Sequence, residues 1–162
     1  KDPYKFLVAS VQKILEETPN DTLFLIENAG TRKVGKSLAE IASIIQKIGN
    51  LRVKVCLDTC HLYATGYDLS DKDKLEDFLQ TFDDTVGLNK LECFHVNDSK
   101  DPVNSGRDRH ENIGKGTIGI NTFKLLLTHP KTKDFPFIIE TPGFKDEGPD
   151  KKNLDILKSL IR

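Results

Sequence analysis

The stretch TLFLIE at residues 22–27 is a nearly continuous apolar run of strand length, which predicts a parallel β-strand buried on both faces. Similar runs recur as VKVCLD (53–58), LECFHV (91–96) and FPFIIE (135–140). Segments with helical periodicity alternate with these runs, at residues 2–17, 37–48, 72–82, 120–128 and 151–161. Strands that alternate with helices at this spacing predict right-handed crossovers and a parallel sheet.

Two architectures fit this alternation, a doubly wound sheet and a (β/α)8 TIM barrel. No GxGxxG motif follows any of the four runs, which disfavours a dinucleotide-binding doubly wound fold. A TIM barrel needs eight strands and roughly 250 residues, whereas this chain offers four strands in 162 residues that begin at Lys1 rather than at Met. We therefore predict an α/β fold in which residues 1–162 form one domain, the C-terminal half of a TIM barrel, with the N-terminal strands missing.

Composition excludes several classes of protein. The chain is 37% hydrophobic and 30% charged, which is ordinary for a globular domain, and its apolar runs are far shorter than the roughly 18 residues of a membrane span. We therefore expect no membrane partner. The three cysteines are an odd number, which suits free thiols in a reducing, intracellular compartment. The 24 basic and 25 acidic side chains give a net charge of -1, so a polyanion would have to be attracted by a local patch or by bound cations.

Potential metal ligands stand at or near the end of every predicted strand, namely Glu27, Asp58, His95 and Glu140. The C-terminal ends of barrel strands meet at one mouth, so these side chains should converge. Three carboxylates in one mouth repel one another, and divalent cations relieve that repulsion. Mixed carboxylate and imidazole ligands suit zinc, manganese or iron. The alternative for any single acidic residue is that it caps the helix that follows.

A second set of ligand types lies in the loops. Asp58 and His61 are three residues apart, and Asp108 and His110 flank Arg109. Residues two apart in an extended chain point the same way, so Asp108 and His110 can bind one ion. The alternative is an ordinary solvated turn. Three of the four histidines thus fall at the predicted mouth, and we assign no function to His129, which follows a helix end.

The loop at residues 97–116 is longer than most barrel connections, and long loops are often functional. It contains Lys100, Arg107 and Arg109, which form a basic rim if a metal neutralises Asp108. With cations at the base of the loop, a phosphate-bearing substrate is favoured. A solvated loop of mixed charge is the alternative.

Five stretches resemble the endonuclease IV family of apurinic/apyrimidinic (AP) endonucleases, also called AP endonuclease family 2. They are LFLIENAGT (23–31), VCLDTCHLYATGYDL (55–69), FHVNDSK (94–100), SGRDRHENIGKGTIG (105–119) and IIETP (138–142). They cover nearly the whole chain in the right order, and the combination is highly specific.

The resemblance implies a (β/α)8 barrel that acts in base excision repair, cleaves DNA on the 5′ side of abasic sites and leaves a 3′-hydroxyl. It implies a cluster of up to three zinc ions. Glu27 would bridge two zincs, and Asp58, His95 and Glu140 would complete one of that pair. His61, Asp108 and His110 would hold the third zinc. Two histidines of the family, from earlier strands, have no counterpart in this sequence.

The mechanism implied is metal-assisted phosphodiester hydrolysis, with Glu27 and Glu140 as the catalytic carboxylates and Arg109, Arg107 and Lys100 as candidate phosphate contacts. Two other functions remain open: a two-metal sugar isomerase of the same barrel architecture, and an inert fragment that binds metal or DNA without turnover. We expect the complete enzyme to be monomeric, whereas a half-barrel invites self-association. Its compartment would be the bacterial cytoplasm or, in a eukaryote, the nucleus or mitochondrion.

Overall fold

A four-stranded parallel sheet forms the centre of the computed structural model, which describes residues 2–30 and 34–162. Its strands stand in chain order, β1–β2–β3–β6. Their bounds are β1 Phe24–Glu27, β2 Val53–Asp58, β3 Leu91–His95 and β6 Phe137–Ile138. The predicted parallel sheet is therefore confirmed. Thr31, at the end of the first motif, lies outside the described residues.

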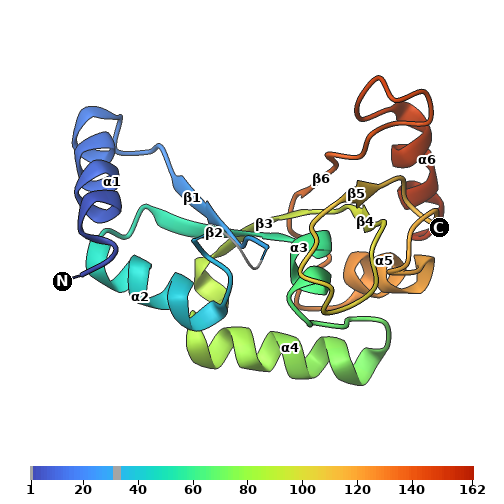
Figure 1. Cartoon of the computed structure of the whole chain (residues 1–162), viewed down its shortest axis with the longest axis horizontal. Helices are drawn as coiled ribbons and strands as arrows, with labels where there is room; N and C mark the ends of the chain where they lie inside the picture. Colours follow the sequence, from blue (N-terminus) through green and yellow to red (C-terminus); the bar gives the residue numbers. More distant parts are fainter. Residues whose placement is uncertain (1, 31–33) are drawn as a thin grey trace.

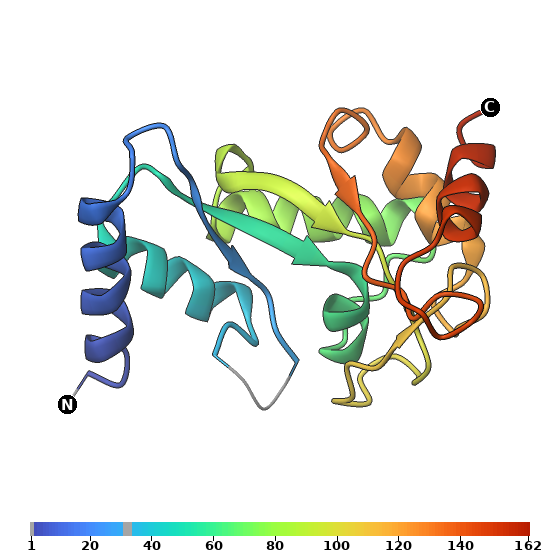
Figure 2. The ribbon, with the colours of Figure 1, turned by 90° about the horizontal axis from the view of Figure 1, so that it is seen from above.

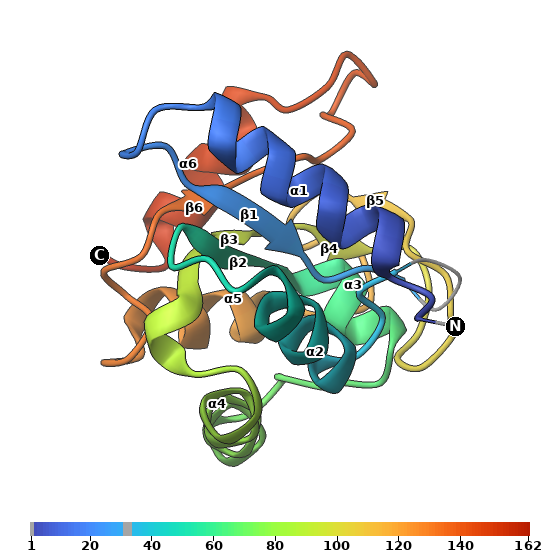
Figure 3. The same cartoon turned by 90° about the vertical axis from the view of Figure 1, so that its left-hand side faces the viewer.

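Five main helices lie in an arc around one side of the sheet (Figure 1). They are α1 Lys5–Glu17, α2 Leu38–Ile48, α4 Lys72–Thr85, α5 Ile120–Thr128 and α6 Lys151–Ser159. The view along the molecule shows the strands enclosed by this arc (Figure 3), and the view from above looks onto the face that no described helix covers (Figure 2). The predicted helices are thus confirmed, with ends that differ by a few residues.

Aspartates begin three of the helices. Asp58, Asp71 and Asp150 each accept a hydrogen bond from the backbone N–H three residues on, at the start of helix α3 (Thr59–Ala64), of α4 and of α6. Such caps satisfy N–H groups that have no partner inside the helix. Asp58 therefore fulfils the capping role that was the alternative to metal binding, and it also lies at the end of β2.

The hydrophobic core lies between the sheet and the arc of helices. Val55 and Leu57 of β2 point into it, next to Phe94 of β3, whose ring stacks on Phe137 with centroids 5.5 Å apart. The other face of the sheet is open, because Leu25 of β1 is 40% exposed. The prediction that the first strand is buried on both faces is therefore wrong. Within the described residues β1 pairs only with β2, and no layer packs on its second face.

The fourth strand is shorter than predicted, since β6 ends at Ile138 rather than at Glu140. The physical reason is that the backbone N–H of Glu140 donates to the side-chain Oδ1 of Asn97, at 2.7 Å, instead of to a strand. Sequence analysis also missed α3 and a small antiparallel pair within the long loop, β4 (Asp98–Ser99) with β5 (His110–Glu111). Within the described residues, 2–30 and 34–162, no helix has the length and apolar character needed to cross a membrane.

Candidate metal centre

Four predicted ligands meet where the parallel strands end. Glu27, Asp58 and His95 are the last residues of β1, β2 and β3, and Glu140 follows β6 by two residues. One ligand atom from each lies within 4.8 Å of the others. We call these four residues the strand-end group. The in-register pairing of Asp58 with His95 explains part of this closeness, because paired residues of adjacent strands point the same way.

Three further predicted ligands lie beside this group and are called the loop group: His61 of α3, Asp108, and His110 at the start of β5. His61 Nε2 is 4.0 Å from Asp108 Oδ2, and the rings of His61 and His110 have centroids 5.4 Å apart. The two groups touch, because His110 Nε2 lies 3.5 Å from Asp58 Oδ2 and His61 Nδ1 lies 3.2 Å from Glu27 Oε1. The fold thus brings all seven predicted residues to one edge of the sheet.

Backbone carbonyls orient two of the imidazoles. Nδ1 of His61 lies 2.9 Å from the carbonyl oxygen of Asn28, and Nδ1 of His110 lies 3.2 Å from that of Glu140. A carbonyl can only accept, so Nδ1 is the nitrogen that keeps its proton in each neutral ring, and Nε2 offers a lone pair once its own proton has left. Those Nε2 atoms face Asp108 and Asp58, as in metal sites where the outer ring nitrogen fixes the tautomer.

His95 is different, because its buried Nδ1 has no hydrogen-bond partner. It lies 3.4 Å from Glu27 Oε1 and 3.3 Å from Glu140 Oε2, close enough for attraction but without a well-aligned hydrogen bond. A buried polar atom without a partner is costly. An ion between this nitrogen and the two carboxylates would satisfy all three, so the donor set fits a divalent cation.

Without a metal, protonated imidazoles balance the carboxylates. Burial by itself raises the pKa of Glu27, but the neighbouring imidazoles of His61 and His95 outweigh burial and lower that pKa to about 2. Burial by itself lowers the pKa of His61, but Glu27 and Asp58 outweigh burial and raise that pKa to about 9. The site therefore requires positive charge, which a metal or protons can supply.

Two buried asparagines hold the ligands, and sequence analysis missed both. Asn28 exchanges hydrogen bonds with the backbone of Asp58, its Oδ1 accepting the N–H at 2.6 Å and its Nδ2 donating to the carbonyl at 3.3 Å. Asn97 Nδ2 donates to Asp58 Oδ2 at 2.6 Å. Their sequence signal is position: each follows a strand-end ligand by one or two residues in a matching motif.

Cys60 lies closer to the ligands than sequence analysis indicated, because its Sγ is within 4.8 Å of ligand atoms of Asp58 and His110. All three cysteines are free and buried, as predicted. Burial is the main cause that raises the pKa of Cys60 to about 12. A thiol that stays protonated is a poor metal ligand, which agrees with the predicted free thiol.

The predicted phosphate contacts lie on the outer part of the long loop. Arg109 donates two hydrogen bonds of 2.7 Å to the carboxylate of Asp101, and Arg107 lies 3.8 Å from the same carboxylate. Lys100 is exposed. The guanidinium of Arg109 is thus held in place by an ion pair within its own loop, while part of it faces solvent.

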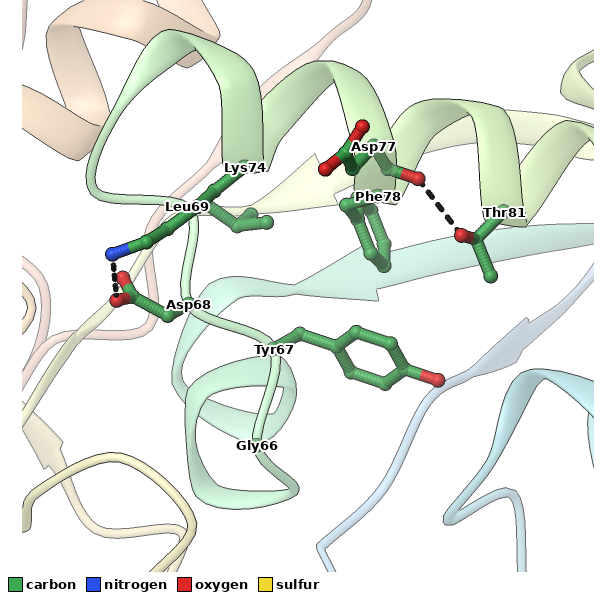
Figure 4. Close-up of a pocket in the computed structure, with 8 residues that line it drawn as sticks. All are labelled: Gly66, Tyr67, Asp68, Leu69, Lys74, Asp77, Phe78 and Thr81. Atoms are coloured by element: carbon green, nitrogen blue, oxygen red, sulfur yellow. Dashed lines mark hydrogen bonds and ion pairs between the residues drawn. The ribbon is translucent and has the colours of Figure 1, made fainter.

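A separate pocket of about 330 Å³ lies between the segment after α3 and the first turns of α4 (Figure 4). Two of its charged groups are already paired, since Lys74 donates to Asp68 at 2.7 Å. Its aromatic side is formed by Tyr67 against the edge of Phe78. It contains none of the seven predicted ligands, so we assign the chemistry to the strand ends.

Comparison with known proteins agrees with this geometry. The sequence profile described as xylose isomerase-like TIM barrel matches residues 2–160. The chain belongs to the xylose isomerase-like TIM barrel family. Within this TIM barrel family, the resemblance to endonuclease IV is confirmed. The chain is 38% identical over 156 residues to the probable endonuclease 4 of Halothermothrix orenii and 39% identical over 155 residues to that of Methanosphaera stadtmanae.

A crystal structure of an endonuclease IV has the same fold as this chain. Endonuclease IV from Thermus thermophilus superimposes with a TM-score of 0.80 at 32% identity, over 95% of this chain and 56% of that one. The two curated relatives are matched over 94% of this chain but only 56% and 55% of their own lengths. The chain therefore spans about half the length of these TIM barrel proteins, and the predicted half-barrel is confirmed.

Proposed function

We propose that this chain supplies most of the metal-binding site of a zinc-dependent DNA repair endonuclease. The complete enzyme would hydrolyse the backbone on the 5′ side of abasic sites in double-stranded DNA and leave a 3′-hydroxyl, as a step of base excision repair. One observation carries this proposal: the strand-end group and the loop group lie at one edge of the sheet and touch. The names of the endonuclease 4 relatives supply the reaction class.

Glu27 has the position of a bridging ligand, because its Oε1 lies within 3.4 Å of both His61 and His95, one residue from each group. The strand-end group would hold an ion through Asp58, His95 and Glu140 with Glu27, and the loop group would hold another. Zinc suits this mixture of carboxylate and imidazole, as do manganese and iron. Bound divalent ions would supply the Lewis acidity that phosphodiester hydrolysis needs at neutral pH.

Glu140 is the catalytic carboxylate that solvent reaches best, since its side chain is 47% exposed against 35% for Glu27 and 0% for Asp58. It is therefore the one that can accept a hydrogen bond from an incoming water and orient it. Glu27 stays fully ionised at neutral pH, consistent with its lowered pKa. Asp58 is buried, and hydrogen bonds from His61 and Asn97 fix the orientation of its carboxyl group.

The outer loop would contact the DNA. Arg109, Arg107 and Lys100 present cationic groups that suit phosphate, and phosphate contacts set the position of a protein on DNA. Their attraction is local, because the net charge of the chain is only -1. The free, buried thiols support the further proposal that the protein is intracellular.

The family description, xylose isomerase-like TIM barrel, keeps a sugar isomerase as the alternative, but the loop group disfavours it. A two-metal isomerase would not need His61, Asp108 and His110, yet the fold places both histidines against the strand-end group and Asp108 beside His61. The inert-fragment alternative concerns only whether this half-barrel turns over by itself. Its open sheet face predicts self-association, which size-exclusion chromatography measures.

The experiment is incision, by the complete enzyme, of a duplex that contains one abasic site, with an undamaged duplex as control. We expect nicking on the 5′ side that EDTA abolishes and added Zn²⁺ restores, and a product that a DNA polymerase can extend from its 3′-hydroxyl. Glu140→Gln should lose the activity. Glu147→Gln, which changes an exposed carboxylate in the same loop, should keep it. No nicking by the complete enzyme with stoichiometric bound metal would refute the nuclease, and aldose turnover would support the isomerase instead.

A further inference from the structure

Asn97 connects three strand ends and is itself completely buried. It lies two residues after His95 in β3, its Nδ2 donates to Asp58 Oδ2 at 2.6 Å, and its Oδ1 accepts the backbone N–H of Glu140 at 2.7 Å. Amide nitrogen only donates and amide oxygen only accepts, so the side chain can make this pair of contacts in one orientation. A single side chain thus spans from the end of β2 to the segment after β6.

We propose that Asn97 is a positioning residue, which sets the distance and orientation of Asp58 and Glu140 so that the strand-end group can bind one metal ion. It does not bind the ion. This inference rests on the metal-binding part of the proposed function and is independent of whether the chain cleaves DNA.

Asn97 is itself held from behind by Thr59. Its backbone N–H donates to Thr59 Oγ1 at 2.9 Å, and the hydroxyl of Thr59 donates back to the carbonyl of Asn97 at 2.6 Å. Both residues are buried. This reciprocal pair fixes the backbone of Asn97 relative to the start of α3, so the amide approaches Asp58 from a fixed direction.

The carboxylate of Asp58 then has one donor on each oxygen. Oδ1 accepts the backbone N–H of His61 at 3.0 Å, and Oδ2 accepts Asn97 Nδ2. Two donors on opposite oxygens stop the carboxylate from rotating and leave the remaining lone pairs for an ion. Removal of the Asn97 amide would free this rotation.

Glu140 depends on Asn97 more strongly, because it lies beyond the last residue of β6 and the ladder no longer holds it. Its N–H is held by Asn97, and its carbonyl accepts from Nδ1 of His110. The chain of contacts therefore continues from Asn97 through Glu140 into the loop group. Displacement of Glu140 should also disturb His110.

The test compares Asn97→Ala with a matched control, Asn112→Ala. Asn112 is also buried and bridges backbone and side chain, with Nδ2 on the carbonyl of Gly143 and Oδ1 accepting from Asn153, but it contacts no candidate ligand. The probe is Co²⁺, whose visible absorption reports its coordination, titrated into the metal-free chain at a temperature where each variant is folded. We expect Asn97→Ala to weaken Co²⁺ binding by roughly 10- to 100-fold, as is typical of residues that orient a ligand, and to change the spectrum.

A second pair of variants covers the case in which Asn97→Ala does not fold. Thr59→Ala removes the hydroxyl that holds Asn97, whereas Thr59→Ser keeps it. We expect weaker Co²⁺ binding and a changed spectrum for Thr59→Ala, and rescue of both by Thr59→Ser.

The outcomes separate the two proposals. Unchanged Co²⁺ affinity and spectrum in Asn97→Ala or Thr59→Ala would overturn the positioning role, as would an equal loss in Asn112→Ala. A wild-type chain that binds no Co²⁺ would overturn both the metal centre and this inference. A wild-type chain that binds Co²⁺ but does not nick abasic DNA would count only against the nuclease, and the comparison of variants would still decide the role of Asn97.

Discussion

The strand-end group and the loop group offer the same kinds of ligand atom, carboxylate oxygen and imidazole nitrogen, but the fold holds them in place in different ways. Glu27, Asp58 and His95 are fixed by the hydrogen-bond ladder of the parallel sheet. His61 is fixed by a short helix, and Asp108 and His110 by a loop of about twenty residues. The difference teaches that the sheet ladder positions most of the first group, with Asn97 holding Glu140 beyond the ladder. The second group needs a set of side-chain contacts that fold the loop back onto the sheet.

Asp98 accepts four of the hydrogen bonds that hold this loop. It is buried, Oδ2 accepts the N–H groups of Gly114 and Gly116, and Oδ1 accepts those of Ser99 and Ile118. Burial is the main cause that raises the pKa of Asp98. The four donors come from both ends of the loop segment that contains β5. Asp98 therefore does for the loop group what the ladder does for the strand-end group.

The largest effect is expected at Asp58, a strand-end residue that also lies against the loop group. Asp58→Asn removes the buried charge that faces both His95 and His110. It should abolish binding at both groups, a loss beyond the roughly 10- to 100-fold of a residue that only orients a ligand. Metal content after dialysis, measured by atomic emission, checks this. Asp84→Asn on α4 is the control, and retention of full metal content by Asp58→Asn would contradict the shared role.

Asp98→Ala should separate the groups. Loss of the four hydrogen bonds from backbone N–H groups should cost about 2–4 kcal/mol of unfolding free energy. It should also weaken metal binding at the loop group by about 100-fold, the upper end for supporting residues, while the strand-end group keeps its ion. Hydrogen exchange at Gly114 and Gly116 together with metal stoichiometry checks this. If Asp98→Ala lost the ions of both groups to the same extent, the two groups would not be held independently.

The pH dependence of metal binding should follow His61. Its pKa is raised to about 9 in the metal-free chain, so the ring is protonated at pH 7 and a metal must displace that proton. Affinity should rise about tenfold per pH unit between pH 7 and 9 and then level off.

Stability of the metal-free chain should change in the opposite sense: the contribution of protonated His61 is complete below about pH 6.5 and is lost as pH rises through 9.

Calorimetric titrations in buffers of different ionisation enthalpy measure the proton that is released. His61→Ala should remove this pH dependence. A pH-independent affinity in the wild-type chain would show that the metal displaces no proton from His61 and that His61 is therefore not a ligand.

Gly30→Ala should disturb only the loop group. A Cβ at position 30 would lie 2.6 Å from Oδ2 of Asp108. That atom is the end of a flexible side chain, so it can move at little cost to folding, and unfolding free energy should change by less than about 0.5 kcal/mol. Loop-group affinity should fall several-fold. If the clash acts through Asp108, the double variant with Asp108→Ala should bind no more weakly than Asp108→Ala alone.

The smallest effect is expected at the outer end of the loop. Arg109→Ala should weaken binding to duplex DNA a few-fold and lower the salt slope by about one. It also uncovers the carboxylate of Asp101, so its effect should exceed that of Arg107→Ala. Fluorescence anisotropy at several salt concentrations checks this, and an unchanged slope would count against a phosphate contact.

Sequence alone established the parallel sheet, because runs such as VKVCLD and LECFHV are mostly apolar and alternate with amphipathic helices. It also identified the strand-end residues, because the ends of parallel strands must lie at the same edge. It overestimated the burial of Leu25, since an apolar run does not show which neighbouring layers are present.

Tertiary structure alone decided how those residues are held. The role of Asn97 depends on hydrogen bonds to Asp58 and Glu140, which are 39 and 43 positions away along the chain. Asp98 and Gly30 likewise act through contacts distant in sequence. Local periodicity carries the pattern of burial, which is why the fold could be predicted, whereas the direction of a polar side chain is set by partners that only folding brings within about 3 Å.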